Sequence, residues 1–354
     1  MTTFPRTSQP LPTPATLLQE FPLSFAEKQK VLADRKTLRS ILRKEDPRLL
    51  LIVGPCSIHD LDSTYAYAER LYAFSQKVAD RFFIVMRTFL EKPRTTVGWK
   101  GFLYDPHLDG SYAIESGLRL SRELLITLVK MGLPIGGEML EISTAPYFSD
   151  LFSWGCIGAR TTTSQPHRQL AASLPFPIGF KNTTEGNVDH AIHGILTAAK
   201  PHNFLGINQT GQLSHMIAQG NTECHLILRG GERKANFSPH DLRTSAEKCL
   251  SAGITPSLIV DCSHDNCHKQ HERQKVAFQS VMQQLQEGND SIVGTMIESH
   301  LFEGNQKASP SPHYGISVTD PCLSWEATQE MIEWAYQIGY AFSSKDITYH
   351  NTRF

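Results

Sequence analysis

The segment VMRTFLEKPRTTVGWKG, residues 85–101, begins as an apolar strand and then becomes strongly cationic. The apolar run Phe82–Met86 predicts a buried strand, and the residues that follow it include Arg87, Lys92, Arg94 and Lys100. Arginine presents planar, bidentate donors that match phosphate and carboxylate groups, and Thr95 and Thr96 add hydroxyl donors. The segment therefore predicts a pocket for a phosphorylated, acidic small molecule. Taken alone, such a loop could equally be a solvated charged segment.

Similar apolar runs recur along the chain, separated by amphipathic segments such as Ile114–Met131 and Lys269–Gln286. Alternating strands and helices indicate βα units and a parallel sheet. Eight such runs predict a (β/α)8 barrel, the TIM barrel, with a doubly wound open sheet as the alternative. The predicted strands are Leu49–Val53, Phe82–Met86, Leu133–Met139, Cys156–Ala159, Pro177–Phe180, His225–Leu228, Leu258–Val260 and Ile292–Ile297.

Three segments fall outside this pattern. Residues 1–20 carry four prolines among Thr and Ser, and we expect an extended or partly disordered arm. Ser24–Glu27 is a capping-box pattern, so a helix is expected from there to about Lys44. A β-hairpin insertion is expected at about residues 203–218. We therefore divide the chain into an N-terminal arm and helix, residues 1–45, and a catalytic barrel, residues 46–345.

The composition excludes several classes of protein. The 354 residues carry a net charge of −1, so no overall field attracts nucleic acid or an anionic membrane. No apolar run approaches the roughly 18 residues that span a bilayer. Seven cysteines, an odd number, argue against a secreted disulfide framework. We expect a cytoplasmic protein that binds neither nucleic acid nor membrane.

Charged residues follow nearly every predicted strand. In a barrel the carboxyl ends of the strands form the active site, and burying so many charges is costly unless they are paired or meet a ligand. The cations could surround phosphate and carboxylate together; singly, each could instead form an ordinary salt bridge at the rim. The cations of this set are Arg87, Lys92, Arg160, Lys181 and Arg229, with Arg94 and Thr95 available for a second phosphate.

A second group of strand-end residues has the chemistry of metal ligands: Cys56, His264, Glu298 and Asp320. A thiolate, an imidazole and two carboxylates suit Mn²⁺, Fe²⁺, Co²⁺ or Zn²⁺ better than Ca²⁺ or Mg²⁺. A competing set is Cys262, Cys267 and His268, but no second pair of ligands completes a structural zinc site there.

Several motifs together resemble the type I class of 3-deoxy-D-arabino-heptulosonate-7-phosphate (DAHP) synthase. They are GPCSIHD at 54–60, EKPRTTVGWKG at 91–101, GARTT at 158–162, GFKN at 179–182, LRGG at 228–231 and ESHLFEGNQ at 298–306. The resemblance implies a feedback-regulated transferase that condenses phosphoenolpyruvate with erythrose 4-phosphate on a (β/α)8 barrel. This reaction is the first step of the shikimate pathway towards chorismate and the aromatic amino acids.

The resemblance also implies roles for individual residues. One divalent metal ion would be held by Cys56, His264, Glu298 and Asp320. Erythrose 4-phosphate would contact Pro93, Arg94, Thr95 and Asp320. Phosphoenolpyruvate would contact Arg87, Lys92, Arg160, Lys181 and Arg229, with Glu138 nearby. We expect Lys92 to deliver a proton, and either Glu138 or His264 to activate the attacking water.

Three other functions fit parts of the sequence. One is a Schiff-base aldolase that uses Lys181. Another is a non-catalytic barrel that senses a phosphorylated metabolite. The third is the sister enzyme that makes an eight-carbon sugar acid phosphate, although the KPRTT motif favours the four-carbon aldose.

The resemblance further implies an aromatic amino acid effector and a homodimer or homotetramer. The sequence departs from the family at Thr183, where Gly is usual, and at Leu174–Pro175, where Leu-Ser is common. The second departure falls in the expected effector pocket, near residues 143–151, 170–176 and the hairpin. Which amino acid binds there stays open.

Overall fold

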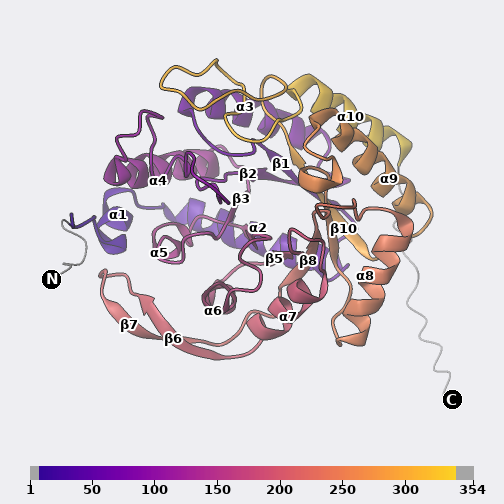
Figure 1. Cartoon of the computed structure of the whole chain (residues 1–354), viewed down its shortest axis with the longest axis horizontal. Coiled ribbons are helices and arrows are strands. Elements are labelled where there is room, and N and C mark those ends of the chain that lie inside the picture. Colours follow the sequence, from indigo (N-terminus) through magenta and orange to yellow (C-terminus); the bar gives the residue numbers. More distant parts are fainter. Residues whose placement is uncertain (1–7, 340–354) are drawn as a thin grey trace.

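Eight parallel strands close into a barrel in the computed structural model, which describes residues 8–339 (Figure 1). Their order around the barrel is β1-β10-β9-β8-β5-β4-β3-β2, so the predicted (β/α)8 fold is confirmed and the open sheet is excluded. The strands are β1 Leu49–Gly54, β2 Phe82–Arg87, β3 Ile135–Glu138, β4 Trp154–Ile157, β5 Ile178–Lys181, β8 His225–Leu228, β9 Leu258–Asp261 and β10 Ile292–Glu298.

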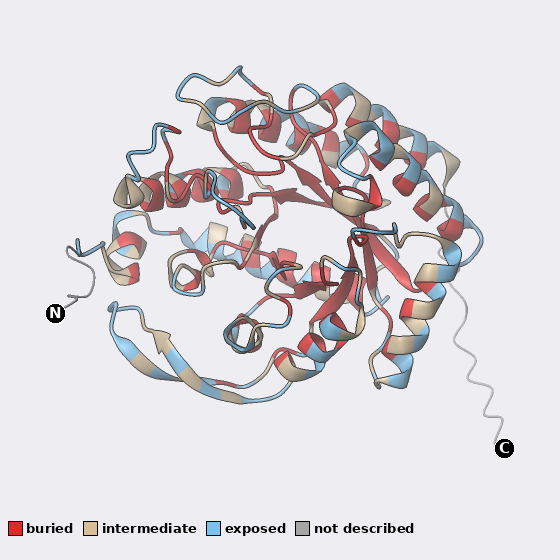
Figure 2. Ribbon diagram, in the orientation of Figure 1, coloured by how far each residue is buried: buried red, intermediate tan, exposed pale blue. Residues whose placement is uncertain are grey.

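The strands form because long apolar runs can be buried on both faces of a closed sheet. In β1 every residue is buried. Leu50 and Ile52 belong to the cluster inside the barrel, whereas Leu49, Leu51 and Val53 belong to the cluster beneath the outer helices. Figure 2 shows this arrangement as buried strands inside helices that are buried on one side only.

The outer helices are α3 Leu61–Lys77, α4 Ile114–Lys130, α5 Ala145–Phe148, α6 Gln165–Ser173, α7 Asp189–Ala198, α8 Pro239–Ser251, α9 Gln274–Gln286 and α10 Trp325–Ile338. Two 3₁₀ turns, η1 His264–Asn266 and η2 His271–Arg273, precede α9. Among the described helices, none is long and apolar enough to cross a bilayer.

The helix predicted after Ser24 is confirmed as α2, Phe25–Leu42, and its capping box between Ser24 and Glu27 is formed. Leu38, Ile41 and Leu42 of this helix pack into the same cluster as Ile52 and Trp154 of the barrel interior. Helix α2 therefore closes the end of the barrel opposite the carboxyl ends of the strands.

The expectation of an extended arm over residues 1–20 is wrong in part, because Pro14–Glu20 forms helix α1. Thr13 caps this helix by accepting a hydrogen bond from the backbone N–H of Thr16, and Pro14 occupies the first turn, where a missing N–H costs nothing. Leu17 is fully buried and gives the helix a partner in the core.

The insertion predicted at residues 203–218 is confirmed as an antiparallel pair, β6 His202–Ile207 and β7 Leu213–Ala218. Some predicted boundaries are wrong: β4 spans Trp154–Ile157 instead of Cys156–Ala159, β3 begins at Ile135 instead of Leu133, and the helix expected from Lys269 begins at Gln274. Residues 1–7 of the arm and 340–345 of the predicted barrel lie outside the described residues.

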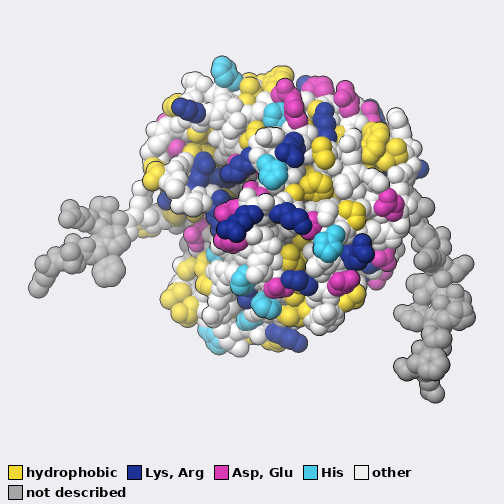
Figure 3. Space-filling view, turned by 45° about the vertical axis from the view of Figure 1, so that its right-hand side comes forward, with side chains coloured by type: hydrophobic (Ala, Val, Ile, Leu, Met, Phe, Trp, Pro, Cys, Tyr) yellow, Lys and Arg dark blue, Asp and Glu magenta, His cyan; other side chains and the backbone are white. Residues whose placement is uncertain are grey.

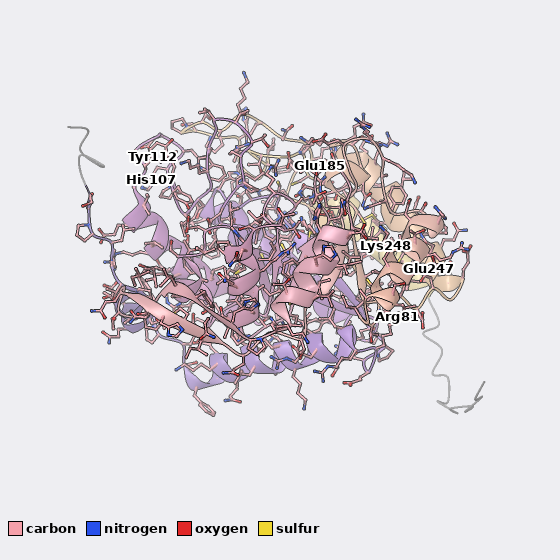
Figure 4. All side chains as sticks on the ribbon, turned by 60° about the horizontal axis from the view of Figure 1, so that its bottom comes forward. Arg81, His107, Tyr112, Glu185, Glu247 and Lys248 are labelled. Carbon is pink, nitrogen blue, oxygen red and sulfur yellow. The ribbon has the colours of Figure 1, made fainter. Side chains whose placement is uncertain are left out.

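The two ends of the barrel can be told apart in Figure 4. Glu185, which follows β5, and Tyr112, in the loop after β2, lie at the top of that view, whereas Arg81, just before β2, lies near the bottom. On the outer ring, Lys248 of α8 pairs with Asp189 of α7 at 2.8 Å. The carboxyl ends of the strands therefore lie towards the top of the view in Figure 4.

A buried histidine lies at the start of β8. His225 Nε2 accepts a hydrogen bond from Trp154 Nε1 at 3.1 Å, while its Nδ1 lies 3.3 Å from the carbonyl oxygen of Glu223. One acceptor and one donor are what a neutral imidazole offers. Burial lowers the pKa of His225 from its ordinary 6.5 to about 4.

This pKa predicts a pH-dependent term in stability. Between pH 6.5 and 4 the unfolded chain binds a proton that the folded chain excludes, so the free energy of unfolding decreases as the pH falls. At about 1.4 kcal/mol per pKa unit, the term reaches about 3 kcal/mol near pH 4. Urea unfolding of the wild type and of His225→Gln at several pH values measures this effect. The free energy of unfolding should decrease less steeply with falling pH in the variant than in the wild type. The same dependence of unfolding free energy on pH in both proteins would contradict a neutral, buried His225.

Candidate active site

A cavity of about 320 Å³ opens at the carboxyl ends of the strands. Figure 3 shows Lys and Arg side chains, with Asp and Glu among them, gathered near the centre of the face in view. The structure brings all the predicted site residues to the lining of this cavity: Cys56, Arg87, Lys92, Pro93, Arg94, Thr95, Glu138, Arg160, Lys181, Arg229, His264, Glu298 and Asp320.

The barrel explains this convergence. Arg87, Glu138, Lys181 and Glu298 are each the last residue of a strand, namely β2, β3, β5 and β10. Other lining residues follow a strand within three positions, as Cys56, Arg160, Arg229 and His264 do. Parallel strands that end at one rim place these side chains together although they are distant in sequence.

Four of the predicted cations have carboxylate partners. Arg87 Nη2 lies 3.1 Å from Glu298 Oε1, Lys92 Nζ lies 2.8 Å from Asp320 Oδ2, and Lys181 Nζ lies 3.0 Å from Asp261 Oδ2. Arg229 pairs with Asp265. Arg160 instead donates from Nε to Thr95 Oγ1 at 3.1 Å. The alternative prediction, that each cation forms a salt bridge, is therefore correct for four of the five cations.

The carboxylates do not use all of the cationic groups. Seven Lys or Arg and five Asp or Glu line the cavity. Arg87 Nη1 and Arg229 Nε are buried and have no hydrogen-bond partner among the described residues. A buried guanidinium N–H left without a partner is costly, so an acceptor that enters the cavity would be bound favourably. The arrangement suits a small anion.

The metal-ligand candidates lie beside these cations. Ligand atoms of Cys56, Glu298 and Asp320 all lie within 4.8 Å of one another, and no other group of this kind occurs in residues 8–339. The competing set of Cys262, Cys267 and His268 is therefore not brought together as a site. The donor set of one thiol and two carboxyls fits a divalent transition ion.

His264 stands at the edge of this group. Its Nε2 lies 3.8 Å from Glu298 Oε1, while its Nδ1 lies 2.8 Å from Asp261 Oδ2. A carboxylate bound to Nδ1 fixes the imidazole orientation and leaves Nε2 free to act as a ligand. The contacts of His264 fit a fourth ligand better than a free base.

The charges around Cys56, Glu298 and Asp320 favour the binding of a cation. Burial and the nearby Glu298 carboxylate raise the pKa of the Cys56 thiol to about 12. Burial favours the neutral form of Asp320, but Lys92 and His264 hold its pKa well below the usual range. Lys92 Nζ also lies 2.9 Å from Cys56 Sγ. A metal ion bound here would deprotonate the thiol.

Glu138 lines the same cavity, beside Gly158. A Cβ atom added to Gly158 would lie 2.1 Å from Glu138 Oε1, well inside van der Waals contact. Glycine at position 158 therefore leaves room for the Glu138 carboxylate to face the cavity.

Comparison with known proteins fits this geometry. The model of the DAHP synthetase I family matches residues 22–333. The chain belongs to the DAHP synthetase I family. It is 48% identical to the Tyr-sensitive phospho-2-dehydro-3-deoxyheptonate aldolase of Escherichia coli K12, over 93% of each chain. It is 44% identical to the Phe-sensitive aldolase of that organism, over 90% of this chain and 91% of the relative.

A solved structure of this family has nearly the same backbone. The phospho-2-dehydro-3-deoxyheptonate aldolase of Francisella tularensis SCHU S4 superposes with a TM-score of 0.92 at 41% identity. The match covers 94% of this chain and 97% of that one. Membership of the DAHP synthetase I family thus agrees with both sequence and fold, and the chain is an enzyme of the transferase class.

Several residues around the site of this family member were not predicted from the sequence. Phe89 stacks against the Arg87 guanidinium at 4.0 Å, and Lys269 lines the cavity from the loop after η1. Asp261 binds both Lys181 and His264. Its position as the last residue of β9 was a signal that could have been read in the same way as Arg87.

One departure from the family pattern has a local explanation. Thr183 follows the Lys181–Asn182 pair in the loop after β5, and its backbone is not among the left-handed residues of the described chain. Its hydroxyl accepts a hydrogen bond from the backbone N–H of Asn187 at 3.1 Å. The loop therefore does not require glycine at this position.

The Gly158→Ala substitution tests the placement of Glu138. The added methyl group would displace the flexible carboxylate rather than backbone, so we expect the melting temperature to change little. We expect kcat to fall by about tenfold or more, equivalent to about 1.4 kcal/mol in the barrier. Steady-state kinetics and a thermal melt measure the two effects. An unchanged kcat would show that the position of Glu138 does not matter.

Proposed function

We propose that this cavity condenses phosphoenolpyruvate with D-erythrose 4-phosphate and water to give DAHP and inorganic phosphate. One observation carries the proposal. Lys92, which begins the KPRTT loop, lies 2.9 Å from Cys56 Sγ and 2.8 Å from Asp320 Oδ2, so the anion-binding loop and the ligand group share one cavity. The relatives carry the name phospho-2-dehydro-3-deoxyheptonate aldolase, which denotes the same product.

The cations divide between two substrates. The partnerless N–H groups of Arg87 and Arg229, together with Arg160 and Lys181, suit the phosphate and carboxylate of phosphoenolpyruvate. Arg94, Thr95 and Pro93, farther out along the same loop, would hold erythrose 4-phosphate against Asp320. Each substrate would then occupy one part of the same cavity, so that the two reacting carbons would lie close together.

Cys56, His264, Glu298 and Asp320 would hold one divalent ion, either Mn²⁺, Fe²⁺, Co²⁺ or Zn²⁺. When bound, this ion supplies Lewis acidity that polarises the aldehyde of erythrose 4-phosphate. The residues around the ligands have their own work. Asp261 orients His264, and Arg87 neutralises part of the Glu298 charge.

The protein groups also move protons. A carbon–carbon bond forms between the enol carbon of phosphoenolpyruvate and the aldehyde carbon, and the aldehyde oxygen gains a proton from Lys92. Burial would lower the pKa of Lys92, but Cys56, Asp320 and Glu298 raise it, so the side chain is held protonated as a donor. Water then adds to the positive C2, and Glu138 accepts its proton. The bond between C2 and the ester oxygen then breaks and phosphate leaves, while the C2 hydroxyl becomes the keto group and gives its proton back to Lys92.

Glu138 fits the role of base better than its rival. His264 Nδ1 already binds Asp261, and its Nε2 is turned towards Glu298. The Glu138 carboxylate faces the cavity beside Gly158 and has no hydrogen bond or ion pair within the described part of the chain that would occupy it.

We further infer an aromatic amino acid effector and a homodimer or homotetramer. Relatives are named for sensitivity to tyrosine or phenylalanine. Residues 12–15, α5 and the hairpin adjoin: Tyr147 Oη donates to the Pro12 carbonyl at 2.7 Å, and the Ala15 N–H donates to the Gln209 carbonyl at 2.8 Å. All seven cysteines are free, which supports our placement of the enzyme in the cytoplasm.

A direct assay separates this function from its rivals. DAHP and phosphate should form from the two substrates, and a chelator should stop their formation until a divalent metal is restored. A Schiff-base aldolase that uses Lys181 would instead be trapped by borohydride with substrate and would survive the chelator. A barrel that only senses metabolites would bind phosphoenolpyruvate without releasing phosphate.

Removing the thiol tests the ligand assignment. We expect Cys56→Ala to lose metal during dialysis and to lose metal-dependent activity, while its melting temperature without metal stays close to that of the metal-free wild type. Metal content, measured by mass spectrometry, is the readout independent of turnover. Cys249→Ala, a buried cysteine on α8, is the matched control and should retain its metal. Full turnover by metal-free Cys56→Ala would refute the assignment.

The effector proposal has its own test. Phenylalanine, tyrosine or tryptophan, added singly to the assay, should inhibit, and deleting the hairpin residues 203–218 should remove the inhibition while leaving activity in place. Activity that is insensitive to all three amino acids would rule out this effector class.

A further inference from the structure

A second, much smaller cavity lies directly behind the wall of the substrate cavity. Its volume of about 20 Å³ is that of roughly one water molecule. The lining includes Glu91, Thr144, Phe148 and Phe152, together with Glu138. Since Glu138 also lines the substrate cavity, its side chain forms part of the wall between the two.

Glu91 is the unusual residue of this small cavity. The residue is 6% exposed, and its Oε2 has no hydrogen-bond partner among residues 8–339. Lys92, the next residue along the chain, does not neutralise it, because the Lys92 ammonium contacts Cys56 and Asp320 instead. An ionised Glu91 would therefore be a buried charge without a counterion, which is strongly disfavoured.

The hydrogen bonds around Thr144 also point to a neutral Glu91. Thr144 Oγ1 lies 2.7 Å from the carbonyl oxygen of Glu141 and 3.1 Å from Glu91 Oε1. The carbonyl can only accept, and a hydroxyl has a single proton to donate. Both contacts are hydrogen bonds only if the Glu91 carboxyl supplies the second proton.

The acidic groups that face Glu91 have the same effect, namely Glu138 at the end of β3 and Glu141 in the following loop. The Tyr104 hydroxyl, from the loop after β2, also faces Glu91 as a hydrogen-bonding group. Burial, reinforced by Glu141 and Glu138, raises the pKa of Glu91 to about 8. A neutral Glu91 adds no negative charge to the surroundings of Glu138.

We propose that Glu91 acts as a neutral carboxylic acid that holds one buried water molecule against Glu138 and so positions the Glu138 carboxylate for its task. The water donates one hydrogen bond to the partnerless Glu91 Oε2 and the other to Glu138. Gly158 leaves room for the Glu138 carboxylate on the substrate side, and the small cavity borders it on the other. This inference rests on the proposed function, in which Glu138 accepts the proton of the attacking water.

Two substitutions separate a neutral group from an anion. Glu91→Gln keeps the shape and the carbonyl oxygen but cannot ionise, so we expect kcat at pH 7 within about threefold of the wild type, well under the tenfold that 1.4 kcal/mol represents. Glu91→Ala removes the water partner, and we expect kcat to fall by about tenfold or more. KM for both substrates should change far less, because the cations that bind them are untouched.

The pH profile is the readout that a purely structural role would not change. Above about pH 8 wild-type Glu91 ionises and repels Glu138, so the ratio of wild-type to Glu91→Gln kcat should decline from pH 7 to pH 9.5. Glu123→Gln, an exposed glutamate on α4, is the matched control and should follow the wild type.

Three results would overturn the inference. They are a Glu91→Gln variant as inactive as Glu91→Ala, a Glu91→Ala variant with wild-type kcat, and a constant ratio across the pH range. If Glu91→Ala fails to fold, the Glu91→Gln comparison still decides. A wild-type enzyme that makes no DAHP would contradict the proposed function instead, so the two failures are distinguishable.

Discussion

The ion pair between Arg87 and Glu298 is the contact on which the mouth of the barrel depends. The two side chains are at most 1% exposed and lie 3.1 Å apart. Burying such a pair costs more than its attraction returns unless further polar contacts are made. Arg87 gains these by donating to the Pro55 carbonyl at 3.2 Å and by stacking on Phe89 at 4.0 Å. The pair joins the anion-binding side of the cavity to the metal-ligand side.

This joining has a chemical consequence. Glu298 accepts from Arg87 with one oxygen and lies in the ligand group with Cys56 and Asp320. The cationic and anionic groups share partners. A metal ion bound on one side would therefore alter the electrostatic potential at the phosphoenolpyruvate site, and bound phosphoenolpyruvate would alter the potential at the metal site. The rest of the barrel supports this polar mouth with an apolar interior, closed below by α2.

Much of this arrangement could be predicted from the sequence. Apolar runs followed by charged residues gave the barrel and the site residues at once, because parallel strands bring their carboxyl ends together regardless of distance along the chain. The capping box at Ser24 and the hairpin could be predicted from local sequence patterns. The grouping of the metal ligands depended on family resemblance, since their spacing carries little information.

Other features depended on contacts that no local pattern reveals. Helix α1 forms because Leu17 has a place in the core, which a proline-rich composition does not disclose. Asp261 serves both Lys181 and His264, a pairing between β5 and β9. The small cavity behind Glu138 arises from side chains of the β2 loop, β3 and α5 packed together. These are consequences of tertiary packing.

The central claim is that one transition ion and a set of cations act together in a single cavity. Anomalous diffraction from a crystal soaked with Mn²⁺ and phosphoenolpyruvate tests it most directly. The account predicts one manganese peak bounded by Cys56, His264, Glu298 and Asp320, with the phosphate and carboxylate of the ligand on Arg87, Arg160, Lys181 and Arg229. Manganese at Cys262, Cys267 and His268, or phosphoenolpyruvate bound elsewhere, would contradict it.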